Sequence, residues 1–468
     1  AVLVLLSGGV LGARAIGKAL GRVGSALDDA ADRSSGSARS GVGGTTLTSS
    51  GRIKLAAGEV SALTIGGDTV FTAVTGRGST TVTATAVADG RQRWQQPVAM
   101  EAAELRLTAV GDLLIVDGES ATTHAKKDAR AVLNAATGAQ RWISAWDDSV
   151  DITYLGTDAL VQRREATRTR LVRVNLLTGA VTWTRPLIED MYLIDERISR
   201  PALTWAAGTA ASAAATTSFD RAFRQPFGVD PGVAVQLSED AKKIEIVDPA
   251  NGSTRAWGPA GLDAELWTVY NNLVIGALAD DDTVVAAFRV TDAKPAWEYQ
   301  FPAGSRVGRV APCGERLVCA SADTSGGGKK LVAIDLDTGV GRWDKGYDFS
   351  GDPAWSVVAD RLVVGDGPFD AIDEASVVDP GTGQASHSFG ARSSGVRVLG
   401  CSGSRLALSG YRLTGTTMTW QVGAAKPDGT AIGSGDVGAK TAKHVGVSGT
   451  ALVALTEQNE VIIYPLPS

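Results

Sequence analysis

Short apolar segments, many of them alternating with polar residues, follow one another from residue 51 to the end of the chain and predict β-strands. TVFTAVT at 69–75 and LLIVDG at 113–118 are typical, because each is a short run rich in β-branched or other apolar residues that ends near glycine. GRIKLAAG at 51–58 alternates like a single strand that has no partner strand before it. The chain after residue 51 is therefore expected to be all-β.

A strand–turn–strand phrase recurs through this region. Its clearest copy is AIDLDTGVGRW at 333–343, in which Asp335 and Asp337 flank a turn at Thr338 and Gly339 before the chain returns to Trp343. Gly339 supplies the positive φ that a tight turn needs, and aspartate side chains can accept hydrogen bonds from nearby backbone N–H groups. Each copy is therefore expected to be a turn between the last two strands of one repeat.

The copies are regularly spaced. The repeat aromatics are Trp94, Trp142, Trp183, Trp257, Trp297, Trp343 and, in place of tryptophan, Phe389. The turn glycines are Gly138, Gly179, Gly252, Gly339 and Gly383. Successive aromatics lie 40 to 48 residues apart, except for one step of 74. A period of about 40–50 residues built from short strands predicts a β-propeller with four antiparallel strands in each blade.

The strands can be grouped into as many as nine units. We expect eight blades, because propellers typically have about four to eight, and the fourth unit is the most doubtful blade. This unit contains an Ala/Ser/Thr-rich insertion near 191–230, which is either a partner-binding segment or a loop without a role. The last unit lacks a strand, so the strand at 51–57 is expected to complete it and close the ring.

Residues 1–33 have a different pattern. Their apolar, uncharged start reaches only Ala13, which is shorter than the roughly 20 residues that span a bilayer. An apolar stripe at helical spacing then follows at Ile16, Leu20, Val23 and Leu27. We expect an amphipathic helix that forms a membrane anchor or the end of one. The alternatives are a signal-peptide remnant or a helix packed on a partner.

Positive charges follow the apolar run at Arg14, Lys18 and Arg22, an order that favours the cytoplasmic side and counts against an external propeller. Residues 34–50, rich in Gly, Ser and Thr, are expected to be a flexible linker. The propeller is expected to occupy 51–468.

The net charge and the cysteines argue against several classes of partner and site. The net charge of the 468-residue chain is -6, so there is no basic excess to bind a phosphate backbone, and nucleic acid is not an expected partner. The 3 cysteines are too few for a disulfide scaffold and match no zinc motif. Cys313 and Cys319 flank a short turn, which leaves open a local disulfide or two buried thiols. A disulfide would indicate an oxidising compartment.

No catalytic, cofactor-binding or metal-ligating residue can be assigned. The 3 histidines, His124, His387 and His444, have no metal-ligand spacing. Asp280, Asp281 and Asp282 are consecutive, whereas calcium loops space their ligands, so a solvated hairpin tip is expected. We therefore expect no enzyme activity and no cofactor.

The recurring phrase resembles the repeat of the pyrroloquinoline-quinone-type propellers over roughly residues 51–468. The match is strongest at Asn134 to Trp142, Asn175 to Trp183 and Asp335 to Trp343. The resemblance implies that each tryptophan packs between neighbouring blades, next to the turn glycine. The family contains quinone-dependent dehydrogenases and non-catalytic propellers that are exported or membrane-anchored. The dehydrogenases' calcium ligands and catalytic aspartate cannot be placed on this chain, and no two cysteines are adjacent.

The blade motifs, the membrane-like N-terminus and the lack of a catalytic set together lead us to expect a scaffold or accessory subunit of a membrane protein complex, respiratory or envelope, with the propeller on the extracytoplasmic side of the cell membrane. The composition suggests an actinobacterial source. The alternatives are a quinone-dependent dehydrogenase with divergent ligands and a sensor that binds a small ligand in the central channel. Fold analogy alone does not choose among them.

Overall fold

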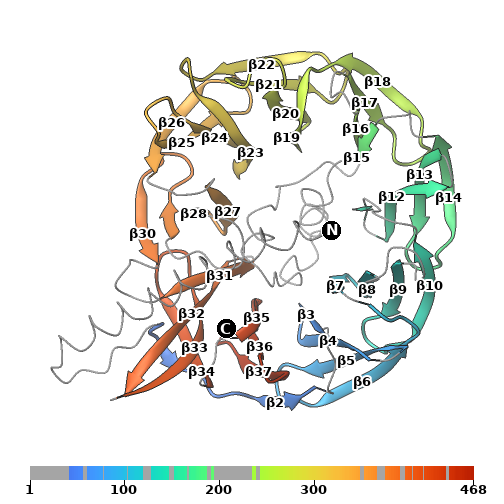
Figure 1. Ribbon diagram of the computed structural model, residues 1–468, viewed down its shortest axis with the longest axis vertical. Helices are drawn as coiled ribbons and strands as arrows, with labels where there is room; N and C mark the ends of the chain where they lie inside the picture. Colours follow the sequence, from blue (N-terminus) through green and yellow to red (C-terminus); the bar gives the residue numbers. More distant parts are fainter. Residues whose placement is uncertain are drawn as a thin grey trace, which may run out of the picture.

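The computed structural model of the chain is a closed ring of radially arranged β-sheets (Figure 1). It describes residues 42–467, apart from 194–233 and shorter segments at 56–60, 77, 103, 120–127, 147–151, 156, 166–167, 187–190, 239–242, 348–352, 366–374, 390–395, 403, 415 and 439–441. The helix expected at 1–33, the start of the linker and nearly all of the insertion therefore lie outside the described residues.

The described residues form nine sheets of four antiparallel strands, called blades one to nine in chain order. Blade one contains β3 (Ser61–Gly66), β4 (Thr69–Thr75), β5 (Thr80–Ala86) and β6 (Gln92–Val98), and blade two contains β7 (Glu104–Val110), β8 (Leu113–Glu119), β9 (Asp128–Asn134) and β10 (Gln140–Trp146). Blade three contains β11 (Ile152–Leu155), β12 (Asp158–Glu165), β13 (Arg168–Asn175) and β14 (Val181–Pro186), and blade four contains β15 (Met191–Leu193), β16 (Ala234–Ser238), β17 (Lys243–Val247) and β18 (Thr254–Pro259). Blade five contains β19 (Leu262–Tyr270), β20 (Leu273–Leu278), β21 (Val284–Arg289) and β22 (Pro295–Gln300), and blade six contains β23 (Arg306–Gly314), β24 (Leu317–Asp323), β25 (Lys329–Asp335) and β26 (Gly341–Tyr347).

Blade seven contains β27 (Ala354–Val358), β28 (Arg361–Gly365), β29 (Ala375–Val378) and β30 (Ala385–Phe389), and blade eight contains β31 (Arg397–Ser402), β32 (Arg405–Thr414), β33 (Thr417–Ala425) and β34 (Ala431–Gly438). Blade nine contains β35 (Ala442–Val447), β36 (Ala451–Thr456), β37 (Glu460–Pro465) and β2 (Gly51–Lys54). The remaining strand, β1 (Thr45–Thr46), adds a fifth strand to blade eight.

The all-β propeller with four-stranded antiparallel blades is confirmed. The described residues form nine such sheets, one more than the eight expected, because the doubtful fourth unit is itself a sheet, β15 to β18. The extra length of this unit lies between β15 and β16, at 194–233, in the connection between two paired strands. The insertion therefore lengthens a hairpin without replacing a strand of the blade.

The burial of the strands follows their place in a blade. All seven residues of β4 are buried, because a middle strand is covered by the neighbouring blades on both faces. In the outermost strand β14 exposed and half-buried residues alternate, because only one face meets the next blade. The near-continuous apolar runs and the alternating ones in the sequence correspond to these two environments.

The ring is closed by the N-terminal strand, as expected: β2 pairs with β37, matching Arg52 with Ile462 and Ile53 with Val461. Residues 42–50 were expected to belong to the flexible linker, but they pack on the ring. Thr45 and Thr46 pair in parallel with β34, and Val42 is 7% exposed within the core of blades seven and eight. The packed segment therefore begins before the expected domain boundary at 51.

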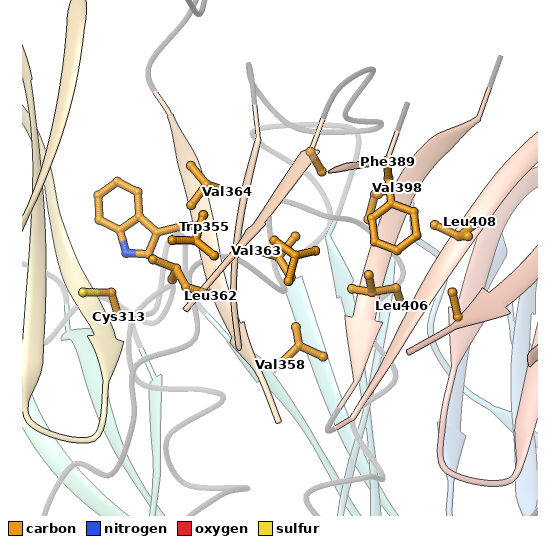
Figure 2. Close-up of a cluster of buried hydrophobic side chains, with 14 of the residues drawn as sticks. Cys313, Trp355, Val358, Leu362, Val363, Val364, Phe389, Val398, Leu406 and Leu408 are labelled. Atoms are coloured by element: carbon orange, nitrogen blue, oxygen red, sulfur yellow. The ribbon is translucent and has the colours of Figure 1, made fainter. Parts of the chain in front are cut away.

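The core is divided into clusters that lie between neighbouring blades. The cluster in Figure 2 joins blades six, seven and eight. In this view Trp355 lies between Cys313 and the valines of blade seven, with Phe389 toward Leu406 and Leu408 of blade eight. Trp355 has no exposed surface. The core of the ring is therefore a series of clusters that join neighbouring blades.

Candidate functional site

The recurring turn is held by one side chain, which in blade six is Asp335. Its Oδ1 accepts hydrogen bonds from the Thr338 backbone N–H and hydroxyl at 3.0 and 2.9 Å. Its Oδ2 accepts from Arg342 Nη2 at 2.7 Å. The bonds from Arg342, followed by those from Thr338, hold the pKa of Asp335 below its ordinary value. The expected role of the aspartate as a local hydrogen-bond acceptor is thus visible in the structure.

The tryptophan that follows each such turn binds the turn of the next blade. Trp343 Nε1 donates to Pro380 O at 2.7 Å, and Trp297 Nε1 donates to Leu336 O at 2.7 Å. The same bond is made by Trp94, Trp142 and Trp183, with acceptors at Ala135, Leu176 and Pro249. We call the position of Trp343, eight residues after Asp335, the lock position. Its side chain joins one blade to the next.

Trp257 does not occupy the lock position of blade four. Ala256 pairs with Ile246, the residue two before the turn aspartate Asp248, and Trp257 comes one residue later. Successive residues of a strand point to opposite faces, so Trp257 points away from the blade-five junction and is 44% exposed. The interpretation of Trp257 as a repeat aromatic is therefore corrected: Ala256 fills this role.

Phe389 is also displaced from the lock position, which in blade seven is held by His387. His387 pairs with Val377, as Trp343 pairs with Ala333 in blade six. A Cβ added to Gly429 in the blade-eight turn would stand 2.5 Å from His387 Cε1, so the imidazole lies under that turn as the indoles do elsewhere. Phe389 is instead buried in the core and contacts His387 edge to face, with 4.6 Å between ring centroids.

At the seam where the two ends of the chain meet, the lock positions hold glycine. A Cβ on Gly433 of blade eight would stand 2.6 Å from Leu47 Cδ2, and one on Gly51 would stand 2.8 Å from Gly90 Cα in the blade-one turn. The N-terminal segment thus fills the space that an aromatic ring occupies elsewhere. Ser50 extends the contact to blade one by donating to Val87 O at 2.6 Å.

Cys313 and Cys319 form a disulfide within the hairpin of β23 and β24. The carbonyls of this hairpin accept bonds from both neighbouring blades. Tyr270 Oη of blade five donates to Gly314 O at 2.8 Å, and Trp355 Nε1 of blade seven donates to Pro312 O at 3.2 Å. Burial raises the pKa of the Tyr270 phenol. The disulfide hairpin therefore connects three blades.

Blades three and four are joined by arginines as well as by Trp183, a feature that the sequence reasoning missed. Arg173 Nη1 donates to Pro249 O at 2.7 Å, and Arg185 Nη2 donates to Glu245 Oε1 at 2.6 Å. Glu245 has no exposed surface and also accepts from the Thr254 hydroxyl. A buried carboxylate needs such partners, because desolvation of an unpaired charge is costly.

The groups singled out for chemistry are dispersed. His124 lies outside the described residues, His387 lies in β30 and His444 in β35. Among the described residues, no group of three or more His, Cys, Asp or Glu side chains could hold a metal ion. Asp281 accepts hydrogen bonds from the Thr283 backbone N–H and hydroxyl at the β20–β21 tip.

In the described part of the chain no helix has the length and apolarity of a membrane span.

Exposed apolar side chains gather on three consecutive blades. Of the six large hydrophobic residues that are notably exposed in the described residues, four belong to blades two to four: Ile143, Leu177, Val181 and Trp257. We call these four the apolar rim. Ile143 follows Trp142 in β10 just as Trp257 follows Ala256 in β18, so each points to the face of its sheet opposite to that of the lock position. The apolar rim is the strongest candidate for a binding surface.

Comparison with known proteins supports a propeller made of PQQ-like repeats. A family model described as "Outer membrane protein assembly factor BamB" matches residues 21–198. The comparison with curated proteins found no match.

Three solved structures match most of the chain at low sequence identity. The crystal structure of BamB from Moraxella catarrhalis is 14% identical, covers 90% of this chain and 100% of its own, and has a TM-score of 0.44. Saccharomyces cerevisiae Sqt1 is 9% identical, with coverage of 91% and 100% and a TM-score of 0.44. The C-terminal WD40 domain of Sif2 is 10% identical, with coverage of 91% and 99% and a TM-score of 0.42. Likenesses this distant carry no argument about function.

Proposed function

We propose that this chain is a non-catalytic scaffold that holds a membrane-associated protein complex together. In this proposal residues 1–33 tether the propeller outside the cytoplasmic membrane, and the apolar rim binds a protein partner. The N-terminal apolar and amphipathic sequence supports the tether. The match to a family model named for an assembly factor supports a role in protein interactions.

The observation that carries the proposal is the exposure of Trp257. A tryptophan in the lock position would stabilise the ring, whereas Trp257 lies one residue out of register and is 44% exposed. Tryptophan is enriched among the residues that contribute most to protein–protein binding, because a large rigid ring buries much area at little entropic cost. Val181 of blade three and Ile143 of blade two are further exposed apolar residues on the two preceding blades.

The test is extraction of native membranes with a mild detergent, purification through a tag on the full chain and mass spectrometry of the co-purifying proteins. We expect a defined set of membrane subunits in fixed ratio. Trp257→Ala should reduce their recovery about tenfold or more, the effect of losing one strong interface residue. Val340→Ala is the matched control, because Val340 is 60% exposed but lies in the blade-six turn.

Two outcomes would contradict the proposal in different ways. Recovery of the chain alone, at the size of a monomer, would remove the scaffold role. Undiminished recovery of the same subunits with Trp257→Ala would leave the scaffold role intact and place its binding surface away from the apolar rim.

A further inference from the structure

The hairpin of β32 and β33 extends past both of its neighbouring strands. The inner strand β31 begins at Arg397, which pairs with Ser409, and the outer strand β34 ends at Gly438, which pairs with Trp420. Among the described residues, those from Tyr411 to Thr419 therefore form two strands without a third beside them. Together with Trp420, which pairs with Gly438 at their base and packs on the core between blades eight and nine, they are called the ribbon. Figure 1 shows this part of blade eight reaching outward at the lower left of the ring.

A two-stranded hairpin is marginally stable in water, and an extension of this kind gains from contact with another surface.

One face of the ribbon is apolar. Tyr411 and Trp420 are directly paired, with 5.8 Å between their ring centroids. Met418 lies two residues before Trp420, hence on the same face, and is 40% exposed. The sequence contains no charged residue from 413 to 425. Arg412 lies on the other face and binds Asp436 at 2.7 Å.

The N-terminal segment joins the ring on the same strand. Val42 packs over Gly423 of β33, and 41 residues precede it, beginning with the uncharged apolar run that ends at Ala13. Gly423 is five residues from Met418, or about 17 Å along the strand. The eight residues 34–41 can span up to about 27 Å, so a tether at 1–33 has the reach to lie level with the tip of the ribbon.

We propose that the ribbon rests on the lipid bilayer beside this tether, with Met418 in the interface and the Tyr411 and Trp420 rings at the headgroup level. This inference rests on the proposed membrane tether. Tyr and Trp favour that level because each has an apolar body and a polar group that stays hydrated. Backbone edges that pair with no strand among the described residues favour the headgroup region, where water supplies hydrogen bonds, over the hydrocarbon core.

The same placement leaves the apolar rim available. In Figure 1 the ribbon points to the lower left, whereas β10, β14 and β18, the outermost strands of blades two to four, lie on the right and upper right of the ring. Lipid contact through blade eight therefore sets the ring on its edge, with the proposed partner surface facing away from the membrane.

The test uses the full chain with a polarity-sensitive fluorophore attached to Met418→Cys. Val340→Cys is the matched control, since Val340 is an exposed apolar residue of blade six. The parent chain, labelled in the same way, gives the contribution of Cys401, because Cys313 and Cys319 are joined. Flotation with vesicles of phosphatidylcholine and phosphatidylglycerol is measured first, and quenching by lipids with brominated acyl chains follows.

We expect the chain to float, with the label at 418 shifted to the blue and quenched by the brominated lipid while the label at 340 is unchanged. Flotation without quenching at 418 would overturn the lipid contact and leave the tether standing. A shift at 418 that appears only with a purified membrane protein complex, and not with vesicles, would assign the ribbon to a protein partner and also overturn it. Failure to float would overturn the tether, and the inference with it.

Discussion

The Trp343 indole lies directly against Gly383 of the following blade. A Cβ added to Gly383 would stand 2.7 Å from Trp343 Cδ2, and φ at this glycine is +71°. The Trp343 Nε1 donates to Pro380 O in the same turn. Glycine thus permits both the left-handed turn and the close approach of the ring. The turn glycine and the tryptophan recur in the sequence because this contact between neighbouring blades is repeated around the ring.

Replacement of Gly383 should therefore cost more than replacement of a glycine that has only the unusual φ. For Gly383→Ala we expect a loss of roughly 1–2 kcal/mol from the left-handed conformation and about 1–3 kcal/mol more from the clash. Gly327→Ala is the matched control, because Gly327 has φ of +80° and nothing within 4 Å of its added Cβ. Urea unfolding of both variants measures the difference. Equal losses of unfolding free energy would show that the Trp343 indole moves aside and relieves the clash.

The displacement of Trp257 predicts that two tryptophans of the repeat differ in their effect on stability. Trp343→Ala should lower the free energy of unfolding by about 3 kcal/mol, because it leaves a gap between blades six and seven. Trp257→Ala should change it by less than about 0.5 kcal/mol, as for other exposed positions. The measurement is the urea midpoint of each variant. A loss at Trp257 comparable to that at Trp343 would contradict the register described here.

The register of the lock position shows how far the sequence could predict the structure. The period of the aromatics was sufficient to predict the propeller, because a tryptophan occupies the lock position in blades one, two, three, five and six. The exact residue could not be read from the nearest aromatic, since Trp257 and Phe389 both stand close to the lock position without occupying it. Counting eight residues from the turn aspartate would have found Ala256 and His387.

Other features could not be predicted because they depend on contacts between distant segments. Gly433 carries no local signal that Leu47 of the N-terminal segment lies over it, and Gly51 carries none that it lies against Gly90 of the blade-one turn. The burial of Glu245 could not be predicted from the sequence either, since its partner Arg185 lies 60 residues earlier, in blade three. Charged residues in a strand normally indicate a solvated face, and only the packing of two blades reverses this expectation.

The Arg185–Glu245 pair predicts a large effect from a single substitution. Arg185→Met should lower the free energy of unfolding by roughly 3–5 kcal/mol, because it leaves the fully buried Glu245 carboxylate without its cation. Adding Glu245→Gln should restore part of the loss by removing the buried charge. The control is Arg289→Met, whose ion pair with Asp292 is exposed and should contribute less than about 1 kcal/mol. Urea unfolding at neutral pH distinguishes the three, and a small effect of Arg185→Met alone would contradict the stabilisation by this ion pair.

The turn aspartates predict how stability depends on pH. Hydrogen bonds from Arg342 and Thr338 lower the pKa of Asp335 in the folded chain. Because the folded pKa is lower than the unfolded value of about 3.9, the stabilisation by Asp335 is fully present above about pH 4 and is lost as the pH falls through the folded pKa. Asp335→Asn should keep the turn, since Asn134 Oδ1 accepts the equivalent bonds from Thr137 in blade two. The variant should thus be less stable than the parent at pH 7, and the difference should shrink below about pH 4. Urea midpoints across this range measure it, and a difference that does not vary with pH would show that the Asp335 charge does not contribute.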